Sequence, residues 1–181
     1  IAEGWIPYRN LQPGYTPLGI FTFAAVRLLV GTVSEQYPVY LGTVLMFEIA
    51  TAVLIVVLGR LYSKDPFLGL FLGLLFLAGC QIHEGSLVFL EPFVTFFSTA
   101  ALLIFLSGPA TGRRLITAGV FVGLAFLSKQ YGMAGLAPLA IGSIYGAGSV
   151  RIWLQRMTFL AAGFLAPPAG LLLYFAAFHG I

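Results

Sequence analysis

Residues 39–59 read VYLGTVLMFEIATAVLIVVLG, a run of 21 residues in which Glu48 is the only charged side chain. An α-helix needs about 20 consecutive apolar residues to cross the hydrocarbon core of a bilayer. The run therefore predicts a membrane-spanning helix. An ionised carboxylate is costly inside a membrane unless it is paired or hydrated. We expect Glu48 to pair with Arg27 or to be protonated, and we assign it a structural role.

The composition of the whole chain points to the same environment. The 181 residues are 60% hydrophobic and 8% charged, and their mean hydropathy is +1.00. A soluble domain carries about 25% charged residues, so this composition excludes a soluble enzyme, a disordered tail and a secreted disulfide scaffold. Cys80 is the only cysteine, and the net charge of +3 is too small for a nucleic-acid-binding surface.

Further apolar runs predict an all-α polytopic membrane protein with about six transmembrane helices. They cover residues 67–82, 86–107, 115–128, 132–148 and 153–178. The shorter run 18–31 contains Arg27, so we expect a juxtamembrane helix there, with a true crossing as the alternative. The predicted organisation is an outward-facing loop with this helix over residues 1–38, then a transmembrane bundle over residues 39–181.

Prolines and glycines in these runs predict where a helix is kinked and where two helices pack closely. Prolines 167 and 168 are expected to kink the last run. Glycines inside apolar runs let neighbouring helices approach closely. We expect this role for Gly69, Gly73, Gly79, Gly119 and Gly123.

The distribution of basic residues predicts the orientation in the membrane. If the crossings alternate, one side receives Arg60, Lys64, Arg113, Arg114, Arg151 and Arg156. The other side receives Arg9, Glu35, His83, Glu84, Glu91 and Lys129. Cytoplasmic loops of membrane proteins are rich in lysine and arginine, so we expect the loops with acidic residues to face outward.

The first candidate site segment is the loop from Gly4 to Pro17, which contains three prolines and two glycines and is not expected to be a regular helix. Its aromatic residues suit the headgroup level of a membrane. It offers Arg9 to a phosphate, next to Tyr8, Asn10 and Tyr15. A plain interfacial loop is the alternative interpretation.

The second segment is Gln81-Ile82-His83-Glu84-Gly85, followed by Glu91-Pro92. Glu91 stands near the start of an apolar run, where a carboxylate is costly unless it lines a hydrated cavity. Pro92 is typical of the first turn of a helix. His83 and Glu84 are also explained as solvated loop residues.

The third segment is Ser128-Lys129-Gln130, which separates two short apolar runs. A lysine in a shallow loop between such runs binds phosphate as a point charge. Snorkelling of its side chain to the interface is the alternative. No phosphate loop, dinucleotide fingerprint or metal-ligand spacing is present in the sequence.

The order of these segments resembles the membrane glycosyltransferases of the GT-C class, in particular protein O-mannosyltransferases and bacterial aminoarabinose transferases. AEGWIPYRN at residues 2–10 is similar to the end of that family's first extracytoplasmic loop. LEPFVTFF at 90–97 resembles its acid-then-proline helix start, and GLAFLSKQ at 123–130 resembles its Gly-Leu-Ala and Ser/Thr-Lys segment. The similarity extends from about residue 2 to residue 138.

This resemblance implies transfer of a sugar from a polyprenyl- or dolichyl-phosphate donor to an acceptor protein, lipid or glycan, with inversion, at the extracytoplasmic face of a prokaryotic plasma membrane. It implies no metal and no cofactor. Glu91 and Glu84 would be the catalytic carboxylates. The substrate-binding residues would be Arg9, Asn10, Tyr8, Tyr15, Lys129, Gln130 and His83.

Two features depart from the family pattern. Relatives commonly carry an Asp-Glu pair in the first loop, and the Asp is the expected base; we expect this pair to precede Ile1, with the chain an internal fragment that is inactive alone. Asn10 stands where similar members often have Asp, and an amide cannot act as a base. A fragment of a secondary transporter and a non-catalytic membrane protein are the alternative functions.

Overall fold

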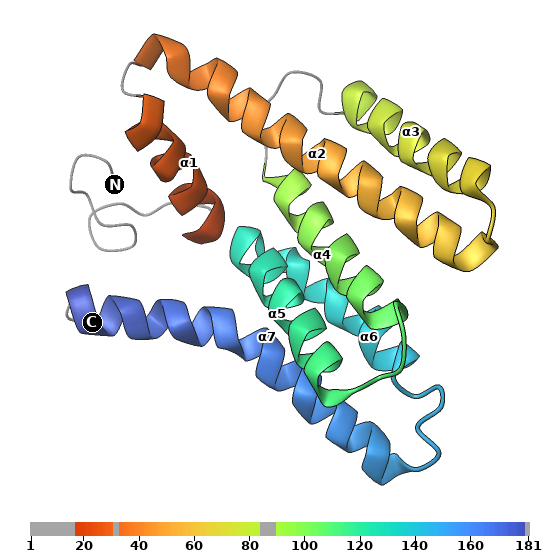
Figure 1. The fold of residues 1–181 in the computed structure, drawn as a ribbon. Helices are drawn as coiled ribbons and strands as arrows, with labels where there is room; N and C mark the ends of the chain where they lie inside the picture. The colour runs from red at the N-terminus through yellow and green to blue at the C-terminus, as the bar shows by residue number, and fades with distance from the viewer. Residues whose placement is uncertain (1–16, 31–32, 84–89, 180–181) are drawn as a thin grey trace. The chain divides into compact units, whose positions relative to one another are not determined.

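The computed structural model describes residues 17–30, 33–83 and 90–179, and every regular element in these ranges is helical. This confirms the all-α prediction for the described part of the chain. The elements, drawn in Figure 1, are α1 (Pro17–Val30), α2 (Val33–Ser63), α3 (Pro66–His83), α4 (Glu91–Leu106), α5 (Gly112–Ser128), the 3₁₀ helix η1 (Gln130–Gly135), α6 (Leu136–Gly142) and α7 (Val150–His179).

The chain divides into two compact units, residues 1–96 and 97–181, which are described separately. The boundary falls inside α4, so the first turns of that helix belong to the first unit. The predicted division between residues 38 and 39 concerns a loop and a bundle, and it stays a prediction.

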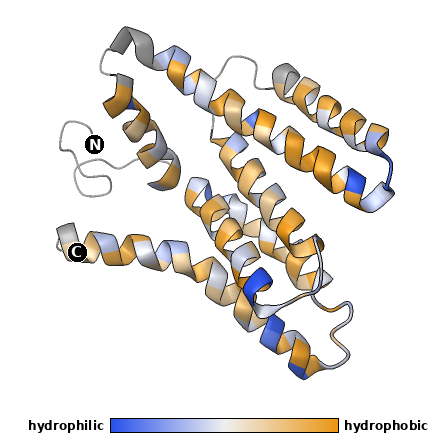
Figure 2. Ribbon diagram, in the orientation of Figure 1, coloured by the Kyte–Doolittle hydropathy of each residue, from blue (hydrophilic) through white to orange (hydrophobic). Residues whose placement is uncertain are grey.

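Within the part of the chain that the structure describes, two helices are long and apolar enough to cross a membrane. They are Tyr37–Ser63 within α2 and Val150–Ala177 within α7. At about 1.5 Å per residue each is roughly 40 Å long, which exceeds the hydrocarbon thickness of about 30 Å. Three shorter apolar helices cover Pro17–Leu29, Pro66–Cys80 and Glu91–Leu106. Figure 2 shows apolar residues along most of the length of α2, α3 and α7.

In the first unit, α2 and α3 form a tight antiparallel hairpin (Figure 1). The chain turns at Lys64, whose φ is 58°, and the Asp65 side chain accepts a 2.8 Å hydrogen bond from the Phe67 amide at the start of α3. A Cβ atom on Gly69 would lie 2.6 Å from the Val56 carbonyl oxygen. Glycine at this position lets the two backbones approach closely.

The glycine predictions for α3 are only partly right. A Cβ atom on Gly73 would lie 2.7 Å from the Val56 side chain, so Gly73 and Gly69 both have the predicted packing role. No atom of the described residues lies within 4 Å of a Cβ position on Gly79, so among these residues Gly79 does not have the predicted packing role. It stands near the far end of the hairpin, where no neighbour meets its Cβ position.

Aromatic rings connect the remaining elements of the first unit. Phe23 of α1 lies 5.1 Å from Tyr40 of α2 and 5.8 Å from Phe93 in the first turn of α4, measured between ring centroids. Phe47 of α2 lies 4.4 Å from Phe93, which is 1% exposed. Offset and edge-on aromatic pairs of this kind stabilise packing beyond the area they bury. The run predicted from residue 18 is helical as far as Val30, and its position relative to a membrane stays a prediction.

In the second unit, α5 and α7 run parallel and pack through glycines. Gly119 lies against the backbone of Phe164, and Gly163 lies against the backbone of Ile116. Gly123 meets Pro167, so the predicted packing roles of Gly119 and Gly123 are confirmed. The core around this contact consists of Ala101, Leu115, Ala118, Val122, Leu139 and Leu160.

This parallel arrangement puts the starts of α5 and α7 at the same end of the unit. A Cβ atom on Gly112, the first residue of α5, would lie 3.0 Å from the ring of Phe159, in the third turn of α7. Arg113, Arg114, Arg151 and Arg156 lie in the first turns of these two helices. Figure 2 shows this end as a cluster of hydrophilic positions. Lys129 follows the last residue of α5 and therefore lies at the other end of that helix.

Two predicted helix boundaries differ from the structure, whereas the long last helix with prolines 167 and 168 inside it forms as predicted. The helix predicted from residue 86 begins at Glu91, with Pro92 in its first turn as predicted. The run 132–148 is not one helix, because α6 ends at Gly142 and the chain then adopts positive φ at Gly146 and Gly148. Helix α7 continues through both prolines, 167 and 168, and Figure 1 shows it bending part-way along its length.

Candidate functional site

The turn after α5 holds Lys129 in a defined backbone conformation. Helix α5 ends at Ser128, because Lys129 is extended, with φ −153° and ψ 146°. The Lys129 amide donates a 3.0 Å hydrogen bond to the Ala125 carbonyl oxygen, and the Lys129 carbonyl accepts a 2.9 Å bond from the Gly132 amide. The Ser128 hydroxyl is fully buried and donates to the Leu124 carbonyl oxygen at 2.9 Å.

Gly132 permits the tight return of the chain after Lys129. A Cβ atom at this position would collide with the Ala125 carbonyl group and lie 2.7 Å from the Phe126 amide nitrogen. Because both neighbours are backbone atoms of α5, a larger residue would displace the 3₁₀ helix η1 from the end of α5. This role of Gly132 was not predicted from the sequence, where the only signal is a glycine three residues after Lys129.

The side chain of Lys129 is half-buried, and its Nζ atom lies 5.7 Å from the centre of the Tyr131 ring. A cation at this distance over an aromatic face is attracted to it. A cation also interacts favourably with the carbonyl groups at the C-terminal end of a helix. These two interactions explain a lysine at this position by structure alone. They also hold its ammonium group near the Tyr131 ring and the end of α5. Gln130, the next residue, is exposed at the start of η1.

Glu91 is the first residue of α4 and belongs to the first unit. Its Oε2 atom is buried, and its sequence neighbours Leu90 and Phe93 are 7% and 1% exposed. A carboxylate in the first turn of a helix is stabilised by the unpaired amides there. The structure therefore gives Glu91 an apolar setting and a helix N-terminus.

Glu48 is the most enclosed acidic residue in the described ranges. It is 3% exposed, its Oε2 atom is buried, and it lies on α2 one turn before Thr51, which is fully buried. The Thr51 hydroxyl donates a 2.7 Å hydrogen bond to the Phe47 carbonyl oxygen. Arg27, its predicted partner, is half-buried on α1 in the same unit, and the pairing stays a prediction.

Several predicted site residues fall outside the described ranges. These are Tyr8, Arg9, Asn10, Tyr15 and Glu84. His83 is the last residue of α3, before the segment that precedes α4. Glu91 belongs to the first unit, whereas Lys129 and Gln130 belong to the second. Within the ranges 17–30, 33–83 and 90–179, no group of three or more His, Cys, Asp or Glu side chains is arranged to hold a metal ion.

A set of hydrogen bonds between the start of α7 and the loop before it was not predicted from the sequence. Arg156 donates hydrogen bonds to the carbonyl oxygens of Ser143, Tyr145 and Gly146 at 2.9, 3.1 and 3.0 Å. The indole of Trp153 lies 3.5 Å from the Ala140 carbonyl oxygen. A tryptophan and an arginine three residues apart at the start of an apolar run, after a glycine-rich loop, were the available signal.

Comparisons with protein-family models, with curated proteins and with solved structures found no match to this chain.

Proposed function

We propose that this protein is a multi-pass membrane glycosyltransferase that moves a sugar from a polyprenyl- or dolichyl-phosphate donor to an acceptor at the extracytoplasmic face. The observation that carries the proposal is the position of Lys129. It is the only basic residue of residues 97–181 that lies outside the first two turns of α5 and α7. A cation held there is suited to the phosphate of a lipid carrier.

The orientation supports the proposed face. Loops rich in arginine face the cytoplasm, and four arginines gather where α5 and α7 begin. If that end is cytoplasmic, the end of α5 that carries Lys129 faces outward. In this proposal α3, α4 and α5 also cross the membrane. These helices of 16–18 residues are about 24–27 Å long, slightly short of the hydrocarbon core.

The proposed reaction is a substitution at the anomeric carbon. An oxygen or nitrogen atom of the acceptor attacks this carbon and forms a bond to it, while the bond from the carbon to the carrier phosphate breaks. The phosphate leaves with the bonding electron pair, and the acceptor's proton passes to a carboxylate. Lys129 would stabilise the developing charge on the phosphate. Glu91 and Glu84 are proposed to hold sugar hydroxyls or to position the cations, and not to be the base that takes this proton. Attack from the side opposite the phosphate would invert the anomeric centre.

Support for this function comes from chemistry that the chain supplies at one place. Lys129 has a fixed backbone, a half-buried stem and an aromatic neighbour, so its ammonium group loses little additional freedom when it binds an anion.

The two lysines of the chain, Lys129 and Lys64, allow a matched experiment. The full-length protein is reconstituted in vesicles with a labelled polyprenyl-phosphate sugar, and transfer is measured for Lys129→Gln and Lys64→Gln. We expect Lys129→Gln to lose about a hundredfold or more in kcat, as when one transition-state donor is removed. We expect Lys64→Gln to keep its rate, and Lys129→Arg to recover part of the loss.

An equal rate for Lys129→Gln and the unchanged protein would remove Lys129 from the site and overturn the proposal. Equal losses in both glutamine variants would also overturn it, because the effect would then be a general one of charge. Helical content and elution volume in detergent serve to show that each variant is folded.

A second candidate function is proton-coupled transport, and Glu48 is the observation that favours it. Ionisable residues within membrane helices commonly serve proton relays, and Glu48 is buried on one of the two helices of membrane-crossing length. Under this alternative, Glu48→Gln abolishes solute uptake driven by a proton gradient. Under the transferase proposal, Glu48→Gln folds and transfers sugar at a rate close to that of the unchanged protein.

A further inference from the structure

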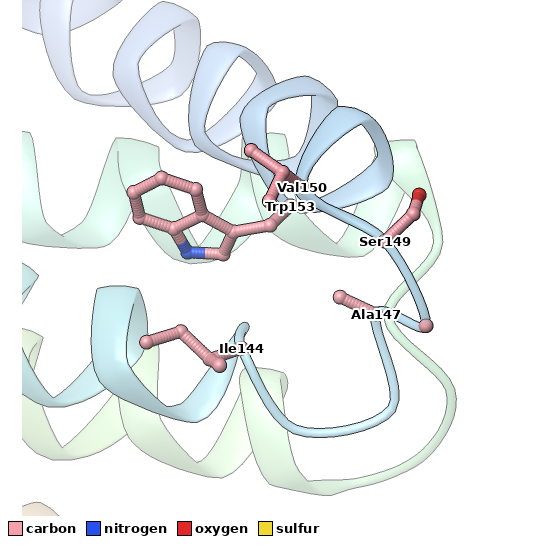
Figure 3. Close-up of a pocket in the computed structure, with 6 residues that line it drawn as sticks. Ile144, Ala147, Ser149, Val150 and Trp153 are labelled. Atoms are coloured by element: carbon pink, nitrogen blue, oxygen red, sulfur yellow. The ribbon is translucent and has the colours of Figure 1, made fainter.

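A cavity of about 360 Å³ lies between the loop that follows α6 and the first turns of α7, within the second unit. It is lined by Ile144, Ala147, Gly148, Ser149, Val150 and Trp153. Figure 3 shows the indole of Trp153 between α7 and the end of α6, with Ile144 across from it and the hydroxyl of Ser149 pointing away. The volume falls within the range of about 300–1,000 Å³ typical of small-molecule pockets. Its apolar walls suit a hydrocarbon group.

The loop that forms one wall is held in a single shape. Three hydrogen bonds from Arg156 satisfy the carbonyl oxygens of Ser143, Tyr145 and Gly146. Gly146 and Gly148 have φ values of 68° and 66°, which glycine adopts at low cost. Ala147, between them, is only 5% exposed. The cavity is therefore preformed, and an occupant would not need to order the loop.

If α7 crosses a membrane, its sequence pattern puts the cavity at the boundary between headgroups and acyl chains. Apart from Thr158, residues 157–178 are apolar or glycine and proline, a stretch long enough to fill the hydrocarbon core of about 30 Å. The residues before it, 150–156, include a tryptophan, a glutamine and two arginines. Tryptophan and arginine are typical of the interface at the end of a membrane helix. The cavity opens at this level.

The second unit has charge complementary to an anionic lipid. Residues 97–181 contain five basic side chains and no aspartate or glutamate. Arg151 directly follows Val150, which lines the cavity, and the side chain of Arg151 is exposed. The planar guanidinium of arginine binds phosphate through paired hydrogen bonds. Arg156 is engaged by the loop, so Arg151 is the basic residue next in sequence to the cavity lining whose side chain is exposed.

We propose that this cavity binds an anionic phospholipid of the surrounding membrane, with the upper part of an acyl chain against Trp153 and the phosphate on Arg151. The site lies at the arginine-rich end of the unit, away from Lys129. It is a site for a resident lipid and not for a sugar donor. The proposal requires a membrane-embedded chain and does not depend on the transferase activity.

Fluorescence quenching of Trp153 tests the site directly. The chain has two tryptophans, so Trp5→Phe leaves Trp153 as the sole emitter. This variant is reconstituted in phosphatidylcholine vesicles that contain a small fraction of phosphatidylglycerol, and either lipid carries bromine near the carboxyl end of its acyl chain. We compare the mole fractions of the two brominated lipids that give the same quenching of Trp153. We expect brominated phosphatidylglycerol to need about one fifth of the mole fraction of brominated phosphatidylcholine, because one arginine near an anionic surface gives a preference of this size.

A comparison of two arginines at the same end of the unit distinguishes lipid binding at a defined site from general electrostatic attraction of anionic lipid. Arg151 and Arg113 are both exposed, and they lie in the first turns of α7 and α5. In the Trp5→Phe background, we expect Arg151→Gln to abolish the preference and Arg151→Lys to retain most of it. Arg113→Gln should keep the preference of the parent. Val150→Phe, which fills the cavity, should reduce quenching by both lipids.

Three results would overturn the proposal. Equal quenching by the two brominated lipids in the Trp5→Phe protein would remove the anionic selectivity. Equal losses in Arg151→Gln and Arg113→Gln would show diffuse attraction instead of a site. Quenching of Trp153 by aqueous iodide, with none by either brominated lipid, would place the cavity in water. Circular dichroism and vesicle flotation establish that every variant is helical and inserted.

Discussion

The guanidinium of Arg156 lies 2.9 Å from the carbonyl oxygen of Ser143, and this bond ties the second turn of α7 to the end of α6. Ser143 is fully buried, and its hydroxyl donates a 2.7 Å bond to the Leu139 carbonyl oxygen. The hydroxyl of Ser143 therefore binds the preceding turn of α6, while its carbonyl oxygen binds α7 through Arg156. This connection explains how a loop with two glycines of positive φ keeps one conformation.

The first prediction concerns this connection. Arg156→Gln removes up to three charge-assisted bonds from loop carbonyls, and we expect it to destabilise the protein by about 1–2 kcal/mol, an amount reduced by the partial exposure of Arg156. Backbone amides of residues 144–149 should exchange faster with deuterium, and Arg156→Lys should restore only part of the protection, because an ammonium lacks the planar fork. Arg151→Gln serves as the control, and protection unchanged in Arg156→Gln would contradict the assignment.

The second prediction concerns the contact between α5 and α7. Gly163 lies against the Ile116 carbonyl group, whereas Gly170 on the same helix has nothing within 4 Å of its Cβ position. We expect Gly163→Ala to lower the unfolding free energy by about 1–3 kcal/mol, since the helices must separate. Gly170→Ala should be neutral or stabilising by up to about 1 kcal/mol. Thermal unfolding in detergent measures both, and equal melting temperatures would refute the close contact.

The helices were predictable from sequence because apolar periodicity and length determine where a membrane helix can form. The run 39–59 lies entirely within α2, and 115–128 lies within α5. The helix predicted over 132–148 failed because apolar character does not distinguish an α-helix from a 3₁₀ helix and a turn. Helix α6 ends at Gly142, and the loop that follows contains two glycines with positive φ, Gly146 and Gly148.

The candidate site was predictable only in part. The free-energy cost of a charge among apolar residues shows which residue is unusual, but it does not show which groups that residue contacts. Lys129 and Glu91 were singled out as charges in apolar runs, and the structure adds the extended backbone of one and the helix N-terminus of the other. Arg156 was predicted only to lie on the cytoplasmic side, and its bonds to three carbonyl oxygens depend on the fold of the loop before α7. Gly79 was expected to pack, and only coordinates identify which glycines face a neighbouring helix.

The third prediction concerns Glu91 under the transferase proposal. Glu91→Gln keeps the volume of the side chain and removes its charge, so the helix start should persist with a cost of about 0.5–1 kcal/mol from the lost interaction with the helix end. If Glu91 orients the donor, kcat should fall by about a hundredfold or more. Sugar transfer and thermal unfolding are measured on the same preparation of the full-length protein. A rate equal to that of the unchanged protein would leave Glu91 with a structural role only.

The fourth prediction separates the placement of Lys129 from its charge. Gly132→Ala puts a methyl group against the Ala125 carbonyl and the Phe126 amide, so η1 must shift and carry the turn at Lys129 with it. A displacement of about 1 Å at a reacting group costs roughly a hundredfold in rate. We therefore expect Gly132→Ala to approach Lys129→Gln in transfer rate while it keeps the lysine.

Gly135 provides the matched control for this fourth prediction. It belongs to the same 3₁₀ helix, and a Cβ atom there would lie 3.5 Å from the Ser98 hydroxyl and from Val122, which is ordinary contact. Gly135→Ala should therefore transfer sugar at close to the parental rate. Equal rates for Gly132→Ala and Gly135→Ala would mean that the turn does not position Lys129 for the reaction. A slow Gly132→Ala protein whose melting temperature matches that of Gly135→Ala would show a positioning effect, because loss of stability alone would lower both measurements.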